Sequence, residues 1–582
     1  MLKTLAACVR EYKGKSIASA LLVALEVVME CLIPFVAAIL IKNIDEGCEL
    51  PVVIGYGALL IVLALISLSF GALAGNACAT ASCGFAKNLR HDLFVRVQGF
   101  SFENIDKFSS ASLVTRLTTD VTNVQMAYMM LIRVAIRSPL MLVFALVMAF
   151  VMGGSMAVIF LAVVPVLALG LILVIRKTMP LFRRVFRRYD KLNESIEENI
   201  AGARVVKSFV REEYETEKFD REARSVCADF TRAEKILAFN GPLMQLCLYS
   251  VMVFTLFFGA RSIIGDPASS FDIGKLSALL TYGFQILMSL MMLSMIFVMM
   301  TISAESANRI AEVLREKATV TSPPNALSCV ENGDVVFEKV SFRYNKKAER
   351  ATLSEIDLSI RSGETVGILG GTGSSKSTLV QLISRLYDVD EGRVLVGGKD
   401  VRDYDLSVLR GAVSVVLQKN TLFSGTVREN LLWGDSDATD EEIREACRMA
   451  CADEFVEALP EKYDTYIEQG GTNVSGGQKQ RLCIARALLK KPKILILDDS
   501  TSAVDTKTDA HIRAAFASFI PETTKIIIAQ RVASVKDADK IVLLEGGRIT
   551  AVGNHETLLQ TSAVYREIYE SQSNTGEEVD GE

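Results

Sequence analysis

Residues 370–378, GGTGSSKST, lie between a short apolar run, ETVGIL, and a helical pattern, LVQLISRL. A strand, a glycine-rich loop and a helix in this order form a phosphate-binding loop, whose consensus is G-x-x-x-x-G-K-[ST]. Gly370, Lys376 and Ser377 match the consensus, whereas Ser375 replaces its second glycine. The stretch therefore predicts an α/β nucleotide-binding domain with one altered loop position.

The loop carries the groups that bind nucleotide phosphates. Consecutive backbone N–H groups ahead of a helix form a nest for an anion. We expect the Lys376 ammonium to reach the β- and γ-phosphates of ATP and the Ser377 hydroxyl to bind Mg²⁺. The predicted ATP-binding residues of the loop are Gly370, Gly371, Thr372, Gly373, Ser374, Ser375, Lys376, Ser377 and Thr378.

A second strand supplies carboxylates to the same site. KILILDD, at 493–499, reads as a buried strand that ends in Asp498 and Asp499. Asp498 suits the magnesium shell, and Asp499 stands where a residue that positions the attacking water belongs. The loop and the strand-terminal carboxylates together predict ATP and Mg²⁺ as ligands.

The N-terminal half differs in kind, because nearly all long apolar runs lie before residue 305. The predicted architecture is an all-α six-helix transmembrane domain fused to an α/β P-loop nucleotide-binding domain. The expected boundaries are 1–313 for the membrane domain with its cytosolic helical extensions, 314–333 for a linker, 334–572 for the nucleotide-binding domain and 573–582 for a disordered acidic tail. Stretches long enough to span a bilayer occur at 16–42, 52–80, 128–153, 155–176, 235–263 and 274–301.

Charge predicts the orientation in the membrane. The segments after the second and fourth spans are rich in Arg and Lys, whereas NIDEGCEL after the first span is acidic. The positive-inside rule therefore places both termini in the cytoplasm. Because the basic segments keep helical periodicity, we expect the spanning helices to continue beyond the bilayer. A net charge of -5 without a basic stripe argues against a nucleic-acid partner, and the eleven cysteines form no cluster with metal-ligand spacing.

Ionisable residues inside the predicted spans are costly and therefore informative. Glu26 and Glu30 share one face of the first span, and Arg133 and Arg137 have the same spacing on the third. One interpretation is a structural set of interhelical ion pairs. The other is a polar wall of a substrate cavity, in which the carboxylates attract cationic solutes. The sequence slightly favours ion pairs, and the two roles are compatible.

The sixth span carries a stripe of methionines. Met288, Met291, Met292, Met295 and Met299 follow helical spacing and so line one face. Most such stripes face lipid or a protein core, but flexible thioethers on a cavity wall would suit varied apolar substrates. The candidate substrate cavity comprises Glu26, Glu30, Arg133, Arg137, Met288, Met292 and Met295.

Further motifs of the C-terminal half support a family resemblance. NVSGGQKQR, at 473–481, looks like the signature motif of ATP-binding cassette (ABC) proteins. Tyr344 resembles the adenine-stacking aromatic of the A-loop, Gln418 in VLQKNTLF the Q-loop glutamine, and SAVD at 502–505 the D-loop. With the six preceding spans, nearly the whole chain resembles a half-transporter of the type IV ABC exporter family. The resemblance adds Gln418 to the catalytic and magnesium-binding residues, and Tyr344, Ser475, Gly476, Gly477, Gln478 and Asp505 to the ATP-binding residues.

The resemblance implies how two such chains work together. Two nucleotide-binding domains clasp two ATP molecules head to tail, and each site uses the P-loop of one chain and the signature of the other. Ser475 and the neighbouring amides at a helix N-terminus would donate to the γ-phosphate only after closure. The stretches at 109–116 and 201–209 would be coupling helices that carry closure to the membrane helices.

Three positions depart from the pattern of this family, and all belong to one composite site. Ser375 replaces a glycine, which costs ~1 kcal/mol if the backbone there is left-handed. Asp499 replaces the catalytic glutamate, and withdrawal of the carboxylate by roughly 1 Å can cost about 10²-fold in rate. Gln530 replaces the switch histidine and lacks its positive charge. ATP binding should survive these changes, whereas hydrolysis should be slow.

The signature is nearly intact, with only Val474 in place of leucine. A chain that keeps its signature but loses its own catalytic groups is explained if its signature serves the P-loop of a partner. The sequence thus predicts the degenerate-site subunit of a heterodimeric exporter of amphipathic or hydrophobic compounds in a bacterial cytoplasmic membrane, paired with a second, competent half-transporter. The alternatives are a homodimer with two slow sites, a lipid or peptide exporter, an importer on an exporter fold, and a nucleotide sensor that transports nothing.

Overall fold

The computed structural model describes residues 2–265, 271–346, 348–500 and 506–577. The chain divides into two compact units, one formed by 1–99 and 108–316 and the other by 100–107 and 317–582. The first unit is helical, and the second combines helices with β-sheets. The predicted fold class is therefore confirmed.

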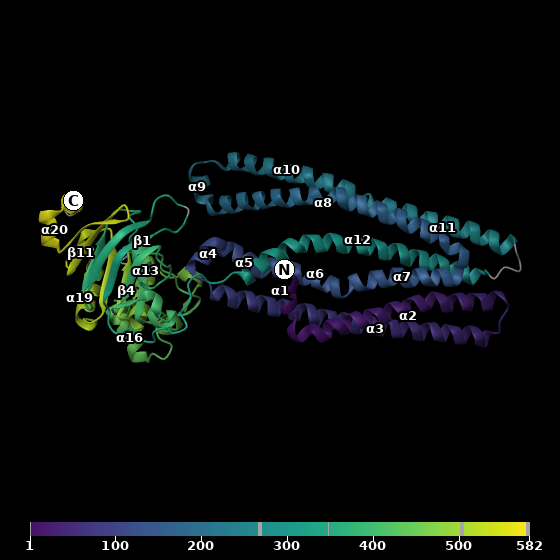
Figure 1. The fold of residues 1–582 in the computed structure, drawn as a ribbon, viewed down its shortest axis with the longest axis horizontal. Helices are drawn as coiled ribbons and strands as arrows, with labels where there is room; N and C mark the ends of the chain where they lie inside the picture. The colour runs from purple at the N-terminus through teal and green to yellow at the C-terminus, as the bar shows by residue number, and fades with distance from the viewer. Residues whose placement is uncertain (1, 266–270, 347, 501–505, 578–582) are drawn as a thin grey trace. The chain divides into compact units, whose positions relative to one another are not determined.

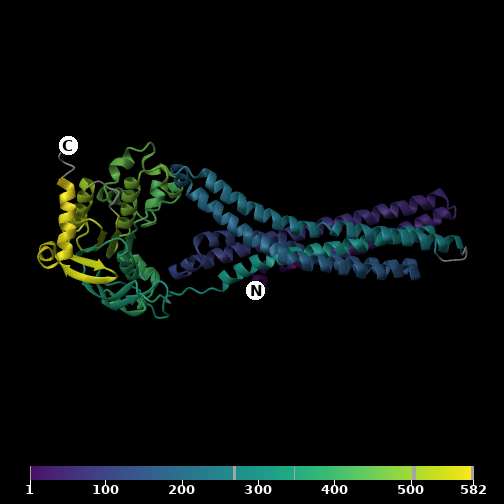
Figure 2. The ribbon, with the colours of Figure 1, turned by 90° about the horizontal axis from the view of Figure 1, so that it is seen from above.

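Long helices dominate the first unit, and Figures 1 and 2 show them running side by side along one direction. Short helices connect them near residues 110–120 and 203–208. In chain order the helical elements are α1 Leu2–Ala7, η1 Arg10–Tyr12, α2 Lys13–Asp45, α3 Leu50–Gln98, α5 Ser110–Thr115, η2 Arg116–Asp120, α6 Val121–Ile132, α7 Val134–Gly153, η3 Gly154–Ala157, α8 Val158–Ala201, α9 Ala203–Ser208, α10 Glu212–Leu237, α11 Asn240–Gly265 and α12 Ile273–Arg315.

The described chain contains five helical stretches that are long and apolar enough to cross a membrane: Arg10–Asp45, Leu50–Gln98, Ser110–Phe182, Glu212–Ile264 and Ile273–Arg315. The third stretch contains two of the predicted spans, which lie on either side of η3. At this turn Gly154 has a φ of +50°, a conformation that favours glycine, and the chain turns back from α7 into α8 (Figure 1).

The helices extend well beyond the thickness of a bilayer, as the sequence predicted. α3 has 49 residues and α8 has 44. At 1.5 Å per residue, α3 is about 70 Å long, whereas the hydrocarbon core of a bilayer is about 30 Å thick. The polar and basic C-terminal parts of both helices therefore project from the membrane.

Small residues bring α2 and α3 close together. Ala74, Ala77 and Ala81 of α3 are buried along one face. Gly84, one turn further on, accommodates the ring of Tyr12, because a Cβ atom at this glycine would lie 2.2 Å from the Tyr12 Cζ atom. Close approach of helices at small residues is typical of membrane proteins.

The second unit contains three sheets. A four-stranded antiparallel sheet has the order β2-β1-β4-β5, and a six-stranded, largely parallel sheet has the order β12-β11-β3-β10-β9-β6. The strands are β1 Val335–Phe342, β2 Leu353–Ile360, β3 Thr365–Leu369, β4 Glu391–Val396, β5 Lys399–Asp400, β6 Val413–Val416, β9 Ile494–Asp498, β10 Thr524–Ala529, β11 Lys540–Glu545 and β12 Arg548–Gly553, and the short pair β7 Gly425–Thr426 and β8 Tyr466–Ile467 forms the third sheet.

The central strands β3, β9 and β10 are buried on both faces, as expected for parallel strands covered by helices. Their hydrophobic side chains contribute to two buried clusters that form the core. The helices of this unit are α4 Phe102–Phe108, most of which belongs here, α13 Lys376–Ile383, α14 Leu406–Ala412, α15 Val427–Leu431, α16 Asp440–Met449, α17 Asp453–Glu457, α18 Gly476–Leu489, α19 Thr506–Phe519, α20 His555–Thr561 and α21 Ala563–Glu577.

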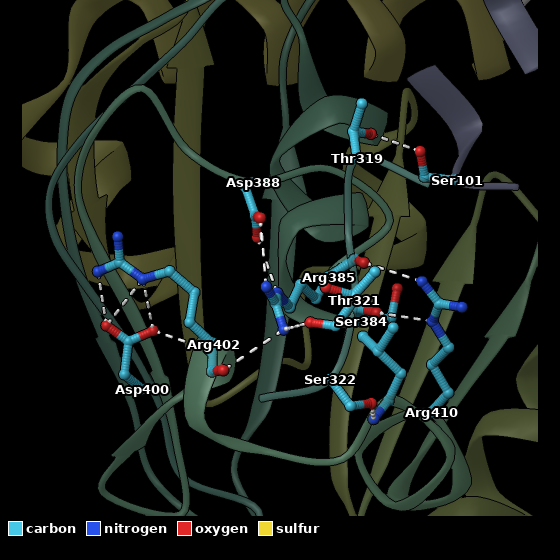
Figure 3. Close-up of polar contacts among 11 residues, drawn as sticks. Ser101, Thr319, Thr321, Ser322, Ser384, Arg385, Asp388, Asp400, Arg402 and Arg410 are labelled. Carbon is cyan, nitrogen blue, oxygen red and sulfur yellow. Dashed lines mark hydrogen bonds and ion pairs between the residues drawn. The ribbon is translucent and has the colours of Figure 1, made fainter. Parts of the chain in front are cut away.

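The irregular segment between α12 and β1 is held on the second unit by polar contacts (Figure 3). Arg385, which is buried just beyond the P-loop helix α13, donates from Nη1 to the Thr321 carbonyl oxygen at 3.2 Å. The Ser322 hydroxyl accepts from the Leu406 amide at 3.0 Å. The segment that the sequence marks as a linker is therefore fixed at both of these points.

Arg385 is itself fixed by its neighbours in Figure 3. Its guanidinium bonds both carboxylate oxygens of Asp388, at 2.8 and 3.2 Å. Arg410 Nη2 donates to the Arg385 carbonyl oxygen at 3.0 Å and so caps the end of the segment that follows α13. The P-loop helix and the linker are thus connected through one arginine.

The C-terminal helix corrects one expectation. α21 continues to Glu577, beyond the predicted boundary at 572, and of the predicted tail only 578–582 lie outside the described residues. The first half of the segment expected to be disordered is therefore helical.

Candidate functional site

Four loops meet at one edge of the six-stranded sheet because they follow neighbouring parallel strands. β3, β10, β9 and β6 are adjacent in that order and parallel. The P-loop follows β3, Gln530 follows β10, Asp498 ends β9 and Gln418 follows β6. Since the carboxyl ends of parallel strands share one edge, these residues converge although they are distant in sequence.

The altered P-loop position has a left-handed backbone. Ser375 is the N-cap of α13, with φ 73° and ψ 24°, and its side chain makes no capping hydrogen bond. A glycine adopts this conformation without penalty, whereas a serine costs ~1 kcal/mol. The cost expected for serine at position 375 required a left-handed backbone, and the backbone is left-handed there.

Lys376 is held inside the loop. Its Nζ atom donates to the carbonyl oxygens of Gly370 and Gly371, both at 2.8 Å. Burial lowers the pKa of the Lys376 ammonium, and the Asp499 and Asp498 carboxylates oppose this effect. The lysine must exchange the two carbonyl contacts for phosphate oxygens when a nucleotide binds.

Asp498 and Ser377 form the part of the site suited to Mg²⁺. Asp498 is 6% exposed, and burial raises its pKa, while a hydrogen bond from Ser377 lowers it. The carboxylate, the Ser377 hydroxyl and the Gln418 amide oxygen are ligands of the type that Mg²⁺ prefers. Among the described residues no cluster of three or more His, Cys, Asp or Glu could hold a metal by itself. Mg²⁺ in proteins is usually bound by one or two carboxylates together with substrate phosphates and water, and Asp498 and Ser377 fit this pattern.

Asp499 connects the three residues predicted to act in catalysis. Its Oδ2 atom accepts from Gln418 Nε2 at 3.3 Å and from Gln530 Nε2 at 3.0 Å. Its amide donates to the Ile528 carbonyl oxygen at 3.0 Å, which fixes the backbone at the end of β9. The short carboxylate therefore faces two neutral amides instead of a cationic histidine.

The P-loop residues 372–378 and the predicted catalytic and magnesium-binding residues line a single cavity of about 290 Å³. It combines the P-loop with the ends of β9 and β10, and it is open to solvent. The residues that line it are Thr372, Gly373, Ser374, Ser375, Lys376, Ser377, Thr378, Gln418, Asp498, Asp499, Ile528 and Gln530. Gly370 and Gly371 lie on the other side of the loop, against a second cavity.

Tyr344 lies next to the P-loop helix, where an adenine-stacking residue is needed. Its hydroxyl is 3.1 Å from the Thr378 hydroxyl and donates to Gln381 Oε1 at 3.1 Å. Tyr344 is 47% exposed, which leaves surface of this residue available to a base.

The sequence reasoning missed Tyr387. Its ring lies edge-on to that of Tyr344, with centroids 5.2 Å apart, and its hydroxyl donates to Asp106 Oδ2 at 2.7 Å. Asp106 belongs to 100–107, which packs with the nucleotide-binding unit. No spacing rule singles out Tyr387, because its role depends on a contact between residues far apart in the chain.

Residues 100–107 belong to the nucleotide-binding unit and directly precede the predicted first coupling helix. That predicted stretch, 109–116, contains α5 of the helical unit. Residues 100–107 bond the linker: Asn104 Nδ2 donates to the Lys317 carbonyl oxygen at 3.2 Å, and the Ser101 and Thr319 hydroxyls are 2.5 Å apart (Figure 3). The predicted second segment, 201–209, contains α9 of the helical unit.

The signature residues lie outside the cavity formed by the P-loop of the same chain. Ser475 is the N-cap of α18, and its hydroxyl accepts from the Gln478 amide at 3.3 Å in a capping box. Gly476 and Gly477 begin the helix, so their amides point out of its N-terminus. The D-loop residue Asp505 lies outside the described residues.

The charges in the membrane unit form an ion-pair cluster. Arg137 Nη1 is 2.6 Å from Glu26 Oε1, and Nη2 is 2.7 Å from Glu30 Oε1. Glu26 is 6% exposed and lies against Gly71 of α3, where a Cβ atom would be 3.0 Å from its Oε1 atom. This geometry supports the structural interpretation of the two glutamates.

Arg133 behaves differently from Arg137, although the sequence paired them. It lies at the break between α6 and α7, with φ −115° and ψ −67°. Its guanidinium packs beside Gly75 of α3, and among the described residues only Arg137 is ion-paired with Glu26 and Glu30. The two arginines still lie one helical turn apart, because the Arg137 amide donates to the Arg133 carbonyl oxygen at 3.0 Å.

The methionine stripe faces outward from the helical unit. Met292 and Met295 are exposed and Met288 is half-buried, whereas Tyr282 and Ile286 on the opposite face of α12 are fully buried. The stripe is therefore accessible to lipid, a partner or a substrate, and it contributes little to the core of its own chain.

Comparisons with known proteins agree with this arrangement. The chain matches the family models for the ABC transporter transmembrane region over 16–291 and for the ABC transporter over 353–502. It is 36% identical over 556 residues to the ABC transporter ATP-binding protein YfiB of Bacillus subtilis, covering 94% of each chain, and 35% identical over 527 residues to Rv1273c of Mycobacterium tuberculosis, covering 90% of this chain and 88% of the relative. A solved bacterial Atm1-family ABC exporter with ATP bound has the same fold, with a TM-score of 0.83, 24% identity, and coverage of 97% of this chain and 98% of that one.

Proposed function

Because the chain belongs to the ABC transporter family, with a transmembrane region and an ATP-binding domain in one polypeptide, we propose that it is the degenerate-site subunit of a heterodimeric exporter. It holds ATP at its own P-loop and contributes its signature to the catalytic site of a partner half-transporter. The pair alternates between inward-facing and outward-facing states in a bacterial cytoplasmic membrane, with the nucleotide-binding domain in the cytoplasm.

The carboxylate of Asp499 carries this proposal. It is one methylene shorter than glutamate, and one of its oxygens already accepts hydrogen bonds from Gln418 and Gln530. A carboxylate withdrawn by roughly 1 Å positions an attacking water poorly, at a cost of about 10²-fold in rate. Neither glutamine supplies the positive charge that a protonated histidine brings to the transition state.

Nucleotide binding is retained, because the groups that bind phosphate and Mg²⁺ are present. Bound Mg²⁺ neutralises phosphate charge. Lys376 moves from the carbonyl oxygens of Gly370 and Gly371 to the phosphates, while Asp498 and Ser377 hold the ion. The strained Ser375 weakens the nest by only ~1 kcal/mol. The site therefore binds ATP and turns it over slowly.

The capped N-terminus of α18 supports a role in trans. Ser475, Gly476 and Gly477 present a hydroxyl and two amides at a helix N-terminus, outside the cavity of their own P-loop. Such an array binds a γ-phosphate, which must then come from the partner. This favours a heterodimer over a homodimer with two slow sites. In a homodimer the intact signature would serve only slow sites, which does not explain why it is intact.

The substrates we propose are amphipathic or hydrophobic compounds, including drugs. The outward-facing Met288, Met292 and Met295 provide adaptable apolar contacts. Arg137 neutralises much of the charge of Glu26 and Glu30, so these glutamates are poor attractors of cations. Transport of labelled hydrophobic compounds into inverted vesicles that hold the chain and its partner tests the proposal. ATP-dependent accumulation supports export, whereas depletion would indicate an importer and no flux a sensor.

A further inference from the structure

The C-terminal helix α21 is firmly attached to the nucleotide-binding unit, where Figure 2 shows it in yellow near the end marked C. Tyr565 is fully buried, and its hydroxyl is 2.7 Å from His555 Nδ1 of α20. Arg566 Nε donates to the Leu559 carbonyl oxygen at 2.8 Å. A helix anchored in this way has a fixed position relative to the sheet.

Gln572 lies two turns beyond Tyr565, on the same face of α21 as Ile568 and Tyr569. Its Oε1 atom accepts from the Val532 amide at 2.8 Å, and its Nε2 atom donates to the Gln530 carbonyl oxygen at 3.0 Å. The primary amide thus pairs with the backbone on both sides of Arg531. Both hydrogen bonds are made to the loop that carries Gln530.

The same helix also faces the P-loop. Val564 and Ile568 line a cavity of about 350 Å³ together with the P-loop residues 370–374 and Gly546. α21 therefore lies beside two parts of the nucleotide site: the P-loop through an apolar cavity, and the loop after β10 through Gln572.

We propose that Gln572 is a positioning residue for ATP hydrolysis, and this rests on the proposed function. It fixes the backbone at Gln530 and Val532, and that backbone aims the Gln530 side chain at Asp499 Oδ2, 3.0 Å away. Gln572 touches neither nucleotide nor metal; it acts through Gln530. The position of α21 thereby sets the geometry of the switch loop.

The test uses the full-length chain in lipid nanodiscs, with the partner that copurifies with it. Gln572→Ala removes both hydrogen bonds, and Gln572→Glu keeps an acceptor for the Val532 amide but loses the donor to Gln530. Glu570→Ala, an exposed residue of the same helix, is the matched control. Hydrogen exchange of the Val532 amide and the kcat and Kd for ATP at this site are measured for each variant.

We expect Gln572→Ala to speed exchange at Val532 about fivefold and to lower kcat about tenfold, with the Kd for ATP unchanged. Gln572→Glu should leave exchange close to wild type and give an intermediate kcat, while Glu570→Ala changes neither. Unchanged exchange, or faster exchange with unchanged kcat, would overturn the positioning role alone. A wild-type chain without any turnover at this site would also overturn the positioning role, whereas the proposed function fails separately, if the copurifying partner lacks a competent catalytic site.

Discussion

Changing Asp499 and Gln530 to the glutamate and histidine of the family pattern should convert a slow site into an active one. In Asp499→Glu the added methylene advances the carboxylate by about 1 Å, and misplacement of that size costs about 10²-fold in rate, or ~2.7 kcal/mol. The single variant still faces Gln530, whose amide is 3.0 Å from Asp499 Oδ2. We therefore expect only part of the gain from Asp499→Glu and about a 10²-fold gain from Asp499→Glu with Gln530→His.

The assay must report on this site and not on that of the partner. A photoreactive azido-ATP that stacks on Tyr344 labels this chain, and label at the γ-phosphate is lost on hydrolysis, whereas label at the α-phosphate is retained. The decay of the ratio of γ- to α-label on the chain gives turnover at its own P-loop. Asp499→Asn, which is isosteric and lacks the charge, is the control and should not speed the decay. If the double variant decays no faster than wild type, the two departures do not limit hydrolysis and the reasoning is refuted.

Four other changes test separate parts of the structure. Arg137→Leu leaves two membrane glutamates without their partner and should lower the free energy of unfolding by about 3–5 kcal/mol, as measured by thermal unfolding in detergent; an unchanged melting temperature would contradict the ion-pair cluster. Tyr387→Phe removes the hydrogen bond to Asp106. It should abolish substrate stimulation of ATP hydrolysis without changing basal hydrolysis, and full stimulation would show that this hydrogen bond does not couple substrate to hydrolysis. Ser375→Gly relieves the left-handed strain and should tighten ATP binding about fivefold by titration; weaker binding would refute this. Burial raises the pKa of Asp498 above its ordinary value of 3.8. Because Mg²⁺ needs the deprotonated carboxylate, Mg²⁺ affinity should begin to fall on acidification at a higher pH than for an ordinary aspartate. Affinity that is constant down to pH ~4 would contradict this prediction.

The sequence could indicate which residues meet at the edge of the six-stranded sheet, because local pattern and backbone geometry coincide there. A strand, a glycine-rich loop and a helix lead to Lys376 and Ser377, and parallel strand order brings Asp499 and Gln530 to them. The left-handed backbone at Ser375 also follows from the consensus, because a glycine normally stands at that position.

The contacts that the sequence did not reveal depend on tertiary packing. Tyr387 meets Asp106 across nearly half of the chain, and Gln572 meets the loop after β10 only because α20 and the sheet fix α21. Among the described residues, Arg137 forms the ion pairs with Glu26 and Glu30, and the shared helical spacing of Arg133 and Arg137 could not indicate which arginine would do so.

Identifying the partner tests the central claim most directly. The full-length tagged chain is purified from its native membrane under mild detergent, and its stoichiometric companion is identified by mass spectrometry and sequenced. We expect a second ABC half-transporter with a glycine before the P-loop lysine, a glutamate after the Walker B aspartate and a histidine in the switch loop. A homodimer, or a companion that also lacks the glutamate and the histidine, would contradict it.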